Sequence, residues 1–343
     1  MGKSGSSSIQ GALVNNEKRL RELGIVHPLP HSSQHGMLAA SYIDPADERF
    51  PRALRPREAL RRSPDLRSYR IRVLEAIRRS ERSVLSTEYF FSLEPAEISE
   101  FKANLRQARI DEVLIFGILR DPVTYFMSYA QQVLKGSSRL PQPDNFFMPY
   151  ARRISAWQKH FSCEFEAFAR LAAPGIGVES GFFASLSRFF AIDAARLAAP
   201  RETINESLSP EEMQLLQDFR CLLFPRSDDR INAATNLFIR VMVAQREHPT
   251  KLPILNPEIA AAVADRHAEE IKAVRDLTGL DISPPPARMR GSGQCARRAP
   301  RAVCDFVCNF DAASYRRLRA RIWLRGPWWV AWNATGLLSE HLR

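Results

Sequence analysis

The pattern of apolar and polar positions divides the chain into two differently built halves. In the first half, two short apolar runs stand between amphipathic segments. The run at 112–119 (EVLIFGIL) predicts a strand buried on both faces, because a continuous apolar run is typical of a sheet covered by helices on each side. The run at 83–91 (SVLSTEYFF) predicts a strand that continues into a loop. Helical spacing of apolar residues predicts helices at 8–23, 66–81, 97–109 and from Pro122 onward.

Beyond Pro149 the pattern is mainly helical. Helices are predicted at 149–161, 184–190, 208–223, 228–246 and 256–279. The start of one of them is well marked, with Ser209 as N-cap, Pro210 in the first turn and Glu212 at the capping-box position. Strands that alternate with helices, followed by a helical half, predict an α/β fold with a parallel sheet. We expect one α/β domain over 1–287 and a separate tail over 288–343.

Composition narrows the class of protein. Hydrophobic residues make up 45% of the chain and charged residues 25%, which are ordinary globular values. No stretch is apolar over the ~18 residues that a membrane-spanning helix needs, and the first residues lack the apolar core of a signal peptide. The expected compartment is therefore the cytoplasm. The five cysteines form no CxxC pair, which argues against a structural zinc site and against a disulfide scaffold.

The net charge of +11 lies mostly in the tail. Residues 288–343 hold eleven arginines against three acidic residues, so they carry +8 and leave +3 for the rest. A body so nearly balanced offers no phosphate-tracking face, and no nucleic-acid partner is expected for it. Arginine, cysteine, proline and tryptophan become frequent together in the tail, as in a shifted reading frame of GC-rich DNA. Our hypothesis is that the tail is frameshifted or poorly constrained, and the alternative is that it binds polyanions.

The first candidate site is the segment 2–8 (GKSGSSS), which stands directly before a predicted helix. Backbone N–H groups at a helix start attract an anion, and a lysine in the same loop reaches a phosphate or sulfate oxygen. The segment differs from the Walker pattern, because its lysine precedes the second glycine. The alternative is a disordered, serine-rich N-terminus. The candidate anion-binding residues are Lys3, Ser4, Gly5, Ser6 and Ser7.

The second candidate site follows the predicted strand 112–119, which ends in Arg120, Asp121 and Pro122. An arginine at the carboxyl end of a parallel strand points into the crevice where α/β folds bind ligands. Ser128 stands eight residues later, two helical turns along the next helix, where it can share the same phosphate. The alternative is that Arg120 merely pairs with Asp121.

Taken together, the two segments resemble the sulfotransferases that use 3′-phosphoadenosine 5′-phosphosulfate. GKSGSSSIQ is similar to that family's 5′-phosphosulfate loop, and LRDPVTYFMSYAQQ is similar to its 3′-phosphate motif. The resemblance runs in order from about residue 2 to 280, and NESLSPEEMQLLQDFRCLLFP has the look of bacterial polysaccharide-type members. The matching positions are Lys3, Gly5, Ser6, Ser7, Arg120 and Ser128.

The resemblance implies a three-layer, P-loop-like fold with helices on both faces of a parallel sheet. It also implies a departure, because a first β-strand leads into the loop in that family and only Met1 precedes Gly2 here. We therefore expect the central strand of the sheet to be missing.

The resemblance further implies transfer of a sulfuryl group from the nucleotide to a hydroxyl of a carbohydrate or glycolipid, without a metal. Lys3 is expected to neutralise the leaving 5′-phosphate, while Arg120 and Ser128 hold the 3′-phosphate. Glu88, in VLSTEYFF, is the candidate general base, and His35 and His31 are the next candidates. The alternative for Glu88 is a strand-end carboxylate that faces solvent or pairs with an arginine.

Three alternative functions stay open at this point. The first is that the chain is an inactive relative without its first strand. The second is that it binds anions or nucleic acid through the arginine-rich tail. The third is a phosphotransferase with a degenerate P-loop, which needs a magnesium-binding acidic residue at a strand end that the sequence does not clearly offer.

Overall fold

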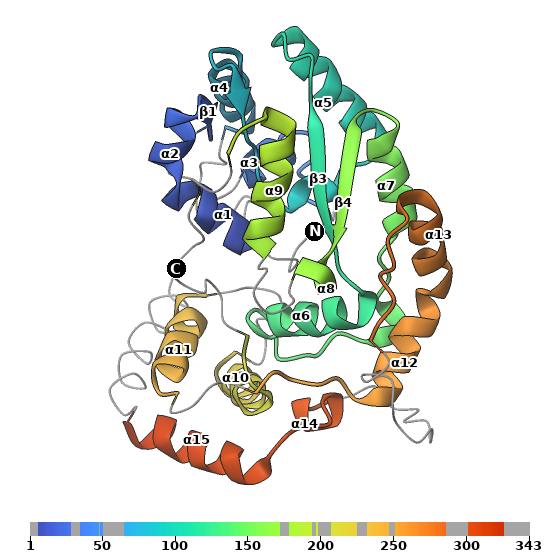
Figure 1. The fold of residues 1–343 in the computed structure, drawn as a ribbon. Helices are drawn as coiled ribbons and strands as arrows, with labels where there is room; N and C mark the ends of the chain where they lie inside the picture. The colour runs from blue at the N-terminus through green and yellow to red at the C-terminus, as the bar shows by residue number, and fades with distance from the viewer. Residues whose placement is uncertain are drawn as a thin grey trace. The chain divides into compact units, whose positions relative to one another are not determined.

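A computed structural model gives the fold of this protein (Figure 1). It describes residues 6–28, 35–47, 49–50, 65–171, 178–193, 197, 207–224, 232–246, 251–285 and 301–325. The chain forms two compact units, each built from segments far apart in sequence. The first comprises Met1–Asp121, Met148–Asn205 and Ala268–Ser283, and the second Pro122–Phe147, Glu206–His267 and Pro284–Arg343. The described residues form a helix-rich, mixed α/β structure with two small parallel sheets, both in the first unit.

Each sheet is a pair of parallel strands. β1 (Ile25–Val26) pairs with β2 (Arg82–Ser83), and β3 (Leu114–Leu119) pairs with β4 (Ser162–Ala167). The strand predicted at 112–119 is confirmed as β3. The predicted strand at 83–91 pairs only at its start, and its end forms a 3₁₀ turn, η2 (Tyr89–Ser92). β1 and β4 lie in segments for which no strand was predicted.

Helices make up most of the rest of the first unit. They are α1 (Ser6–Asn15), α2 (Glu17–Glu22), α3 (Gly36–Ala40), α4 (Leu66–Arg78), α5 (Pro95–Gln107), α7 (Tyr150–Gln158), α8 (Phe168–Leu171), α9 (Val178–Phe190) and α13 (Ala268–Thr278). The single helix predicted at 8–23 is two helices. Between them, the buried Asn16 side chain donates a hydrogen bond to the carbonyl of Ala12 at 2.8 Å. Asparagine commonly interrupts a helix through such a local bond.

Helices cover both faces of the β3–β4 pair. Successive side chains of a strand point to opposite faces, and β3 follows this rule. Ile115 packs into the apolar cluster that holds Phe101 of α5 and Trp157 of α7, whereas Phe116 packs into the cluster of α1 and α9. A third cluster joins Leu119 to α7 and α13. Burial of each large apolar side chain contributes about 1.5–3 kcal/mol, so these clusters hold the two-stranded pair in place.

The second unit is helical in the described ranges. Its helices are α6 (Pro122–Leu134), α10 (Pro210–Leu223), α11 (Ala233–Ala244), α12 (Pro257–Arg266), α14 (Val303–Phe306) and α15 (Ala312–Arg325), with the short turn η3 (Pro143–Asn145). The capping box predicted for α10 is confirmed, because Ser209 Oγ accepts the Glu212 N–H at 3.1 Å and Glu212 accepts the Ser209 N–H at 2.8 Å. The buried Glu212 also forms an ion pair with the half-buried Arg246, at 2.7 Å.

Part of the predicted tail is built into the second unit. Its buried apolar residues belong to the same cluster as α6, α10 and α12, and they are Val303, Phe306, Val307, Leu318 and Ile322. The side chain of Gln217 of α10 joins residues 301–303 to α10 through two hydrogen bonds. It donates to the carbonyl of Arg301 at 2.8 Å and accepts the N–H of Val303 at 3.1 Å. Within residues 301–325 the chain is therefore packed. The reading-frame hypothesis for 288–343 stays a prediction.

Within the described ranges, no helix combines the length and the apolar character that a bilayer crossing requires.

Candidate functional site

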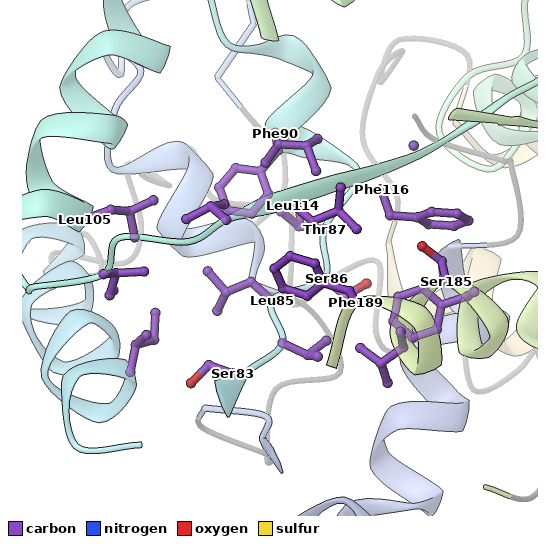
Figure 2. A pocket seen from close by; sticks show the side chains of 18 of the residues that line it. Ser83, Leu85, Ser86, Thr87, Phe90, Leu105, Leu114, Phe116, Ser185 and Phe189 are labelled. Carbon is purple, nitrogen blue, oxygen red and sulfur yellow. The ribbon is translucent and has the colours of Figure 1, made fainter. Parts of the chain in front are cut away.

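A cavity of about 430 Å³ lies inside the first unit. Two consecutive stretches, 80–88 and 109–119, form two of its sides, and helices α1, α4, α5, α7 and α9, the turn η2 and Phe165 of β4 contribute the remaining walls. Most of the lining is apolar, as the side chains of Leu85, Phe90, Leu105, Leu114 and Phe116 illustrate (Figure 2). The cavity is within the size range of ligand sites, but its walls suit an apolar occupant.

Two residues predicted for the site meet at this cavity. Ser6 is the first residue of α1, and Glu88 stands directly before η2. The hydroxyl of Ser6 donates a hydrogen bond to Oε2 of Glu88 at 2.9 Å, across 82 residues of sequence. Both residues are half-buried and both line the cavity. The end of the predicted anion loop therefore lies against the predicted general base.

The rest of the predicted loop is placed only in part. Ser7 is the second residue of α1 and is half-buried. Lys3, Ser4 and Gly5 lie outside the described residues. The N–H groups of the first turn of a helix have no partner within the helix, so the start of α1 presents donors beside the Ser6 hydroxyl.

Arg120 lies immediately after β3, as the sequence predicts. Its guanidinium stacks on the ring of Phe168, which follows β4, with 4.4 Å from Cζ to the ring centroid. Its carbonyl accepts a hydrogen bond from the fully buried Tyr150 hydroxyl at 2.8 Å. The first contact orients the guanidinium of Arg120, and the second holds its backbone carbonyl. A cation fixed at a strand end in this way suits an anionic ligand group.

Ser128 belongs to the second unit. It lies on α6 between Met127, which is buried, and Tyr129, which is exposed, and it is itself half-buried. Arg120 belongs to the first unit, so the structure describes the two predicted phosphate ligands in separate bodies.

His35, the next candidate for the base, has a structural role. Its side chain is fully buried; Nε2 lies 2.9 Å from the carbonyl of Pro28, and Nδ1 accepts the Ser86 N–H at 3.1 Å. Burial lowers the pKa of His35 below its usual value. Both ring nitrogens are used by backbone groups, so this ring is not available to a substrate. His31 lies outside the described residues.

Several hydroxyl groups of the cavity were not predicted. Ser83, Ser86 and Thr87 lie on one side of the cavity, and Ser185 of α9 lies among its walls (Figure 2). The hydroxyl of Ser185 donates to Glu164 of β4 at 2.6 Å. The signal for the first group was present in SVLSTE, where hydroxyl residues recur at the end of an apolar run. For Ser185 the sequence offers no comparable signal.

A metal centre has no support within the described parts of the chain, where no three His, Cys, Asp or Glu side chains gather around a common point. The comparisons give the site no further identity. No protein-family model, curated protein or solved structure matches the chain.

Proposed function

We propose that this protein is a sulfotransferase that moves a sulfuryl group from 3′-phosphoadenosine 5′-phosphosulfate to a hydroxyl of a carbohydrate or glycolipid. The observation that carries the proposal is the 2.9 Å hydrogen bond from Ser6 to Glu88. It joins the end of the donor-loop motif to the candidate base, and these are the two parts that the reaction needs close together. In this proposal the first unit is a three-layer, P-loop-like fold, and the helices on both faces of β3 and β4 support that assignment.

Donor binding falls to two groups of residues. Lys3 and the N–H groups from Gly5 to Ser7 bind the 5′-phosphosulfate at the start of α1, where the helix dipole favours negative charge. Arg120 binds the 3′-phosphate. The stacking of Arg120 on Phe168 supports this role, because it fixes the direction of the guanidinium before the nucleotide arrives.

In the transfer step, the acceptor oxygen forms a bond to sulfur as the bond from sulfur to the 5′-phosphate oxygen breaks. Glu88 takes the proton of the acceptor hydroxyl, and Lys3 neutralises the charge that develops on the leaving phosphate. The products are a sulfate ester and adenosine 3′,5′-bisphosphate. Glu88 accepts a hydrogen bond from Ser6, which holds its side chain beside the start of α1.

One observation favours a second function, the binding of polyanions. Helix α15 exposes three arginines, Arg316, Arg317 and Arg319. A row of exposed arginines on one helix attracts phosphate groups without regard to a fixed site. This binding is expected to weaken steeply with salt, whereas binding at a built donor site depends on single residues.

The donor site is tested by calorimetric titration of the full chain with adenosine 3′,5′-bisphosphate. We expect micromolar binding, weakened about tenfold or more (about 1.4 kcal/mol) by Lys3→Ala and by Arg120→Ala. The matched controls are Lys18→Ala on α2 and Arg106→Ala on α5, which remove exposed cations of the same kind. Both are expected to bind like the wild type.

The rival function predicts the opposite pattern. A chain that binds through α15 keeps its affinity in Lys3→Ala and loses it in Arg316→Ala, and that result would overturn the proposal. Glu88→Gln separates binding from chemistry, because it keeps the shape of the side chain and removes the base. It is expected to bind the nucleotide normally and to lose sulfuryl transfer by about 10²–10⁴-fold.

A further inference from the structure

His35 bonds to Ser86 through both its backbone and its side chain. Its N–H donates to the carbonyl of Ser86 at 2.8 Å, and its ring Nδ1 accepts the N–H of Ser86 at 3.1 Å, across 51 residues of sequence. Two residues earlier, the N–H of Val84 donates to the carbonyl of Val26 of β1 at 2.9 Å. In an extended chain the N–H groups of alternate residues point to the same edge. β1 and His35 therefore hold the segment 84–88 along one edge.

The partners of the His35 ring define where its proton lies. Nε2 is 2.9 Å from the carbonyl of Pro28, and a carbonyl oxygen only accepts, so Nε2 is the donor. Nδ1 accepts the N–H of Ser86 and therefore carries no proton. These contacts assign a neutral ring with its proton on Nε2. The ring is fully buried, and burial lowers the pKa of His35 below its usual value, which favours this neutral form.

A proton on Nδ1 is incompatible with the contact to Ser86. Nδ1–H and the N–H of Ser86 would be two donors that face each other, so the bond between them would be lost. The carbonyl of Ser86, 3.4 Å from Nδ1, is the acceptor for the new proton, but it already accepts the N–H of His35. Protonation of the ring therefore leaves the N–H of Ser86 without its acceptor and requires the segment 84–88 to move.

The groups that face the ring also favour its neutral form. The ring of His27 packs edge-to-face with it, and His27 is itself buried. Helix α3, which His35 directly precedes, holds no titratable residue. On the segment 84–88 the charged residue is Glu88, whose carboxylate is bonded to Ser6. A proton on the ring of His35 therefore meets apolar surroundings and a second imidazole, and both raise the cost of the charge.

The contact with His35 lies close to the candidate base. Ser86, Thr87 and Glu88 follow one another along the wall of the cavity, where the first two are seen in Figure 2. Only Thr87 separates Ser86 from Glu88, so a movement of Ser86 is passed directly to Glu88. The carboxylate of Glu88 then leaves the hydroxyl of Ser6, with which it forms the 2.9 Å hydrogen bond.

We propose that His35 is a positioning residue for Glu88. The neutral ring holds the segment 84–88 through Ser86, and a proton on Nδ1 removes this contact and displaces Glu88 from Ser6. The consequence for sulfuryl transfer rests on the proposed function of Glu88. The contact between His35 and Ser86, and its loss on protonation, do not rest on that function.

Amide hydrogen exchange of the full chain at pH 7 and pH 5, corrected for the intrinsic effect of pH on exchange, tests the contact. The amide of Val84 is the internal reference, because its acceptor is a carbonyl of the residue before His27 and an effect of His27 alone reaches it as well. The ring of His35 has a pKa of about 6.5 once exposed and a lower pKa while buried, so a fall in pH favours opening. We expect Ser86 to lose about tenfold or more protection relative to Val84.

The matched variant is His35→Asn, whose side-chain oxygen can accept the N–H of Ser86 and does not titrate. In this variant the protection of Ser86 relative to Val84 is expected to be the same at both pH values. A parallel loss at Val84 and Ser86 in the wild type would overturn the proposal, as would an equal loss at Ser86 in His35→Asn. If His35→Asn does not fold, nitrogen-15 NMR of the wild-type imidazole decides, because a proton on Nδ1 of His35 at pH 7 contradicts the assignment.

Sulfuryl transfer keeps this proposal apart from the proposed function. Between pH 7 and pH 5 we expect kcat of the wild type to fall about tenfold more than kcat of His35→Asn, with a similar KM for the nucleotide in both. Equal pH profiles of two active proteins would overturn the positioning role. If neither transfer nor nucleotide binding is found while Ser86 responds to pH as expected, the sulfotransferase assignment fails and the contact with His35 stands.

Discussion

The buried ring of His27 makes the stability of the first unit depend on pH. His27 follows β1 directly and is only 3% exposed, and neither ring nitrogen has a hydrogen-bond partner in the described structure. The ring of His35 packs edge-to-face with the ring of His27, and the two ring centroids are 4.8 Å apart. Burial, followed by the charge that His35 can carry, lowers the pKa of His27 to about 4. Protonation of His27 therefore opposes folding.

The size of the effect follows from linkage. The unfolded chain has a histidine pKa of about 6.5 and binds a proton between pH 6.5 and 4, where folded His27 does not, so stability is complete above pH 6.5 and falls as the pH drops towards 4. Each unit of difference corresponds to about 1.4 kcal/mol, which gives a loss of about 2 kcal/mol between pH 8 and pH 5. His35, whose pKa burial also lowers, adds to the loss in the same direction.

The assay is urea unfolding, followed by tryptophan fluorescence, at pH 8 and at pH 5. The wild type and His27→Leu are compared, because leucine fills a similar apolar space and does not titrate. We expect the free energy of unfolding of the wild type to fall by about 2 kcal/mol more than that of His27→Leu over this range. An identical fall in the two proteins would show that His27 is not held neutral in the folded state.

Three further predictions concern other parts of the fold. Glu212→Ala removes the capping box of α10 and the carboxylate that pairs with the half-buried Arg246, and it is expected to lower the free energy of unfolding by about 2–4 kcal/mol in urea titrations. Gly117→Val is expected to destabilise the β3–β4 pair by about 1–3 kcal/mol, because a Cβ at this position lies 2.7 Å from the ring of Phe165; the double variant with Phe165→Ala should recover part of the loss. Burial raises the pKa of the Cys163 thiol to about 11, so iodoacetamide at pH 8 should label it at least tenfold more slowly than the exposed Cys221, as peptide mass spectrometry can measure.

Elements with strong local signals could be predicted from the sequence. Three such signals are the unbroken apolar run of β3, the proline at the start of α6 and the capping box of α10. The structure confirms all three predictions. β1 was not predicted because two residues are too few to show a period. β4 was not predicted because Glu164 and Glu166 made its segment look polar, although Cys163 and Phe165 alternate with them as a half-buried strand requires.

The candidate site was predictable only in its parts. The chemistry of Ser6 and Glu88 could be proposed from motifs, but their contact spans 82 residues and depends on how α1 packs beside the segment that follows β2. The cavity was beyond the sequence for the same reason, because both of its sides come from elements that are neighbours only after folding. The structural role of His35 also needed the fold, since the groups that occupy its ring nitrogens belong to Pro28 and Ser86.

We propose that the start of α1 and the end of β3 bind one nucleotide. Amide hydrogen exchange of the full chain, with and without saturating adenosine 3′,5′-bisphosphate, tests this binding because it reports each segment separately. We expect slower exchange at Ser6 and Ser7 and at Arg120 together, with α15 unchanged. Protection confined to α15, or none at saturation, would contradict it.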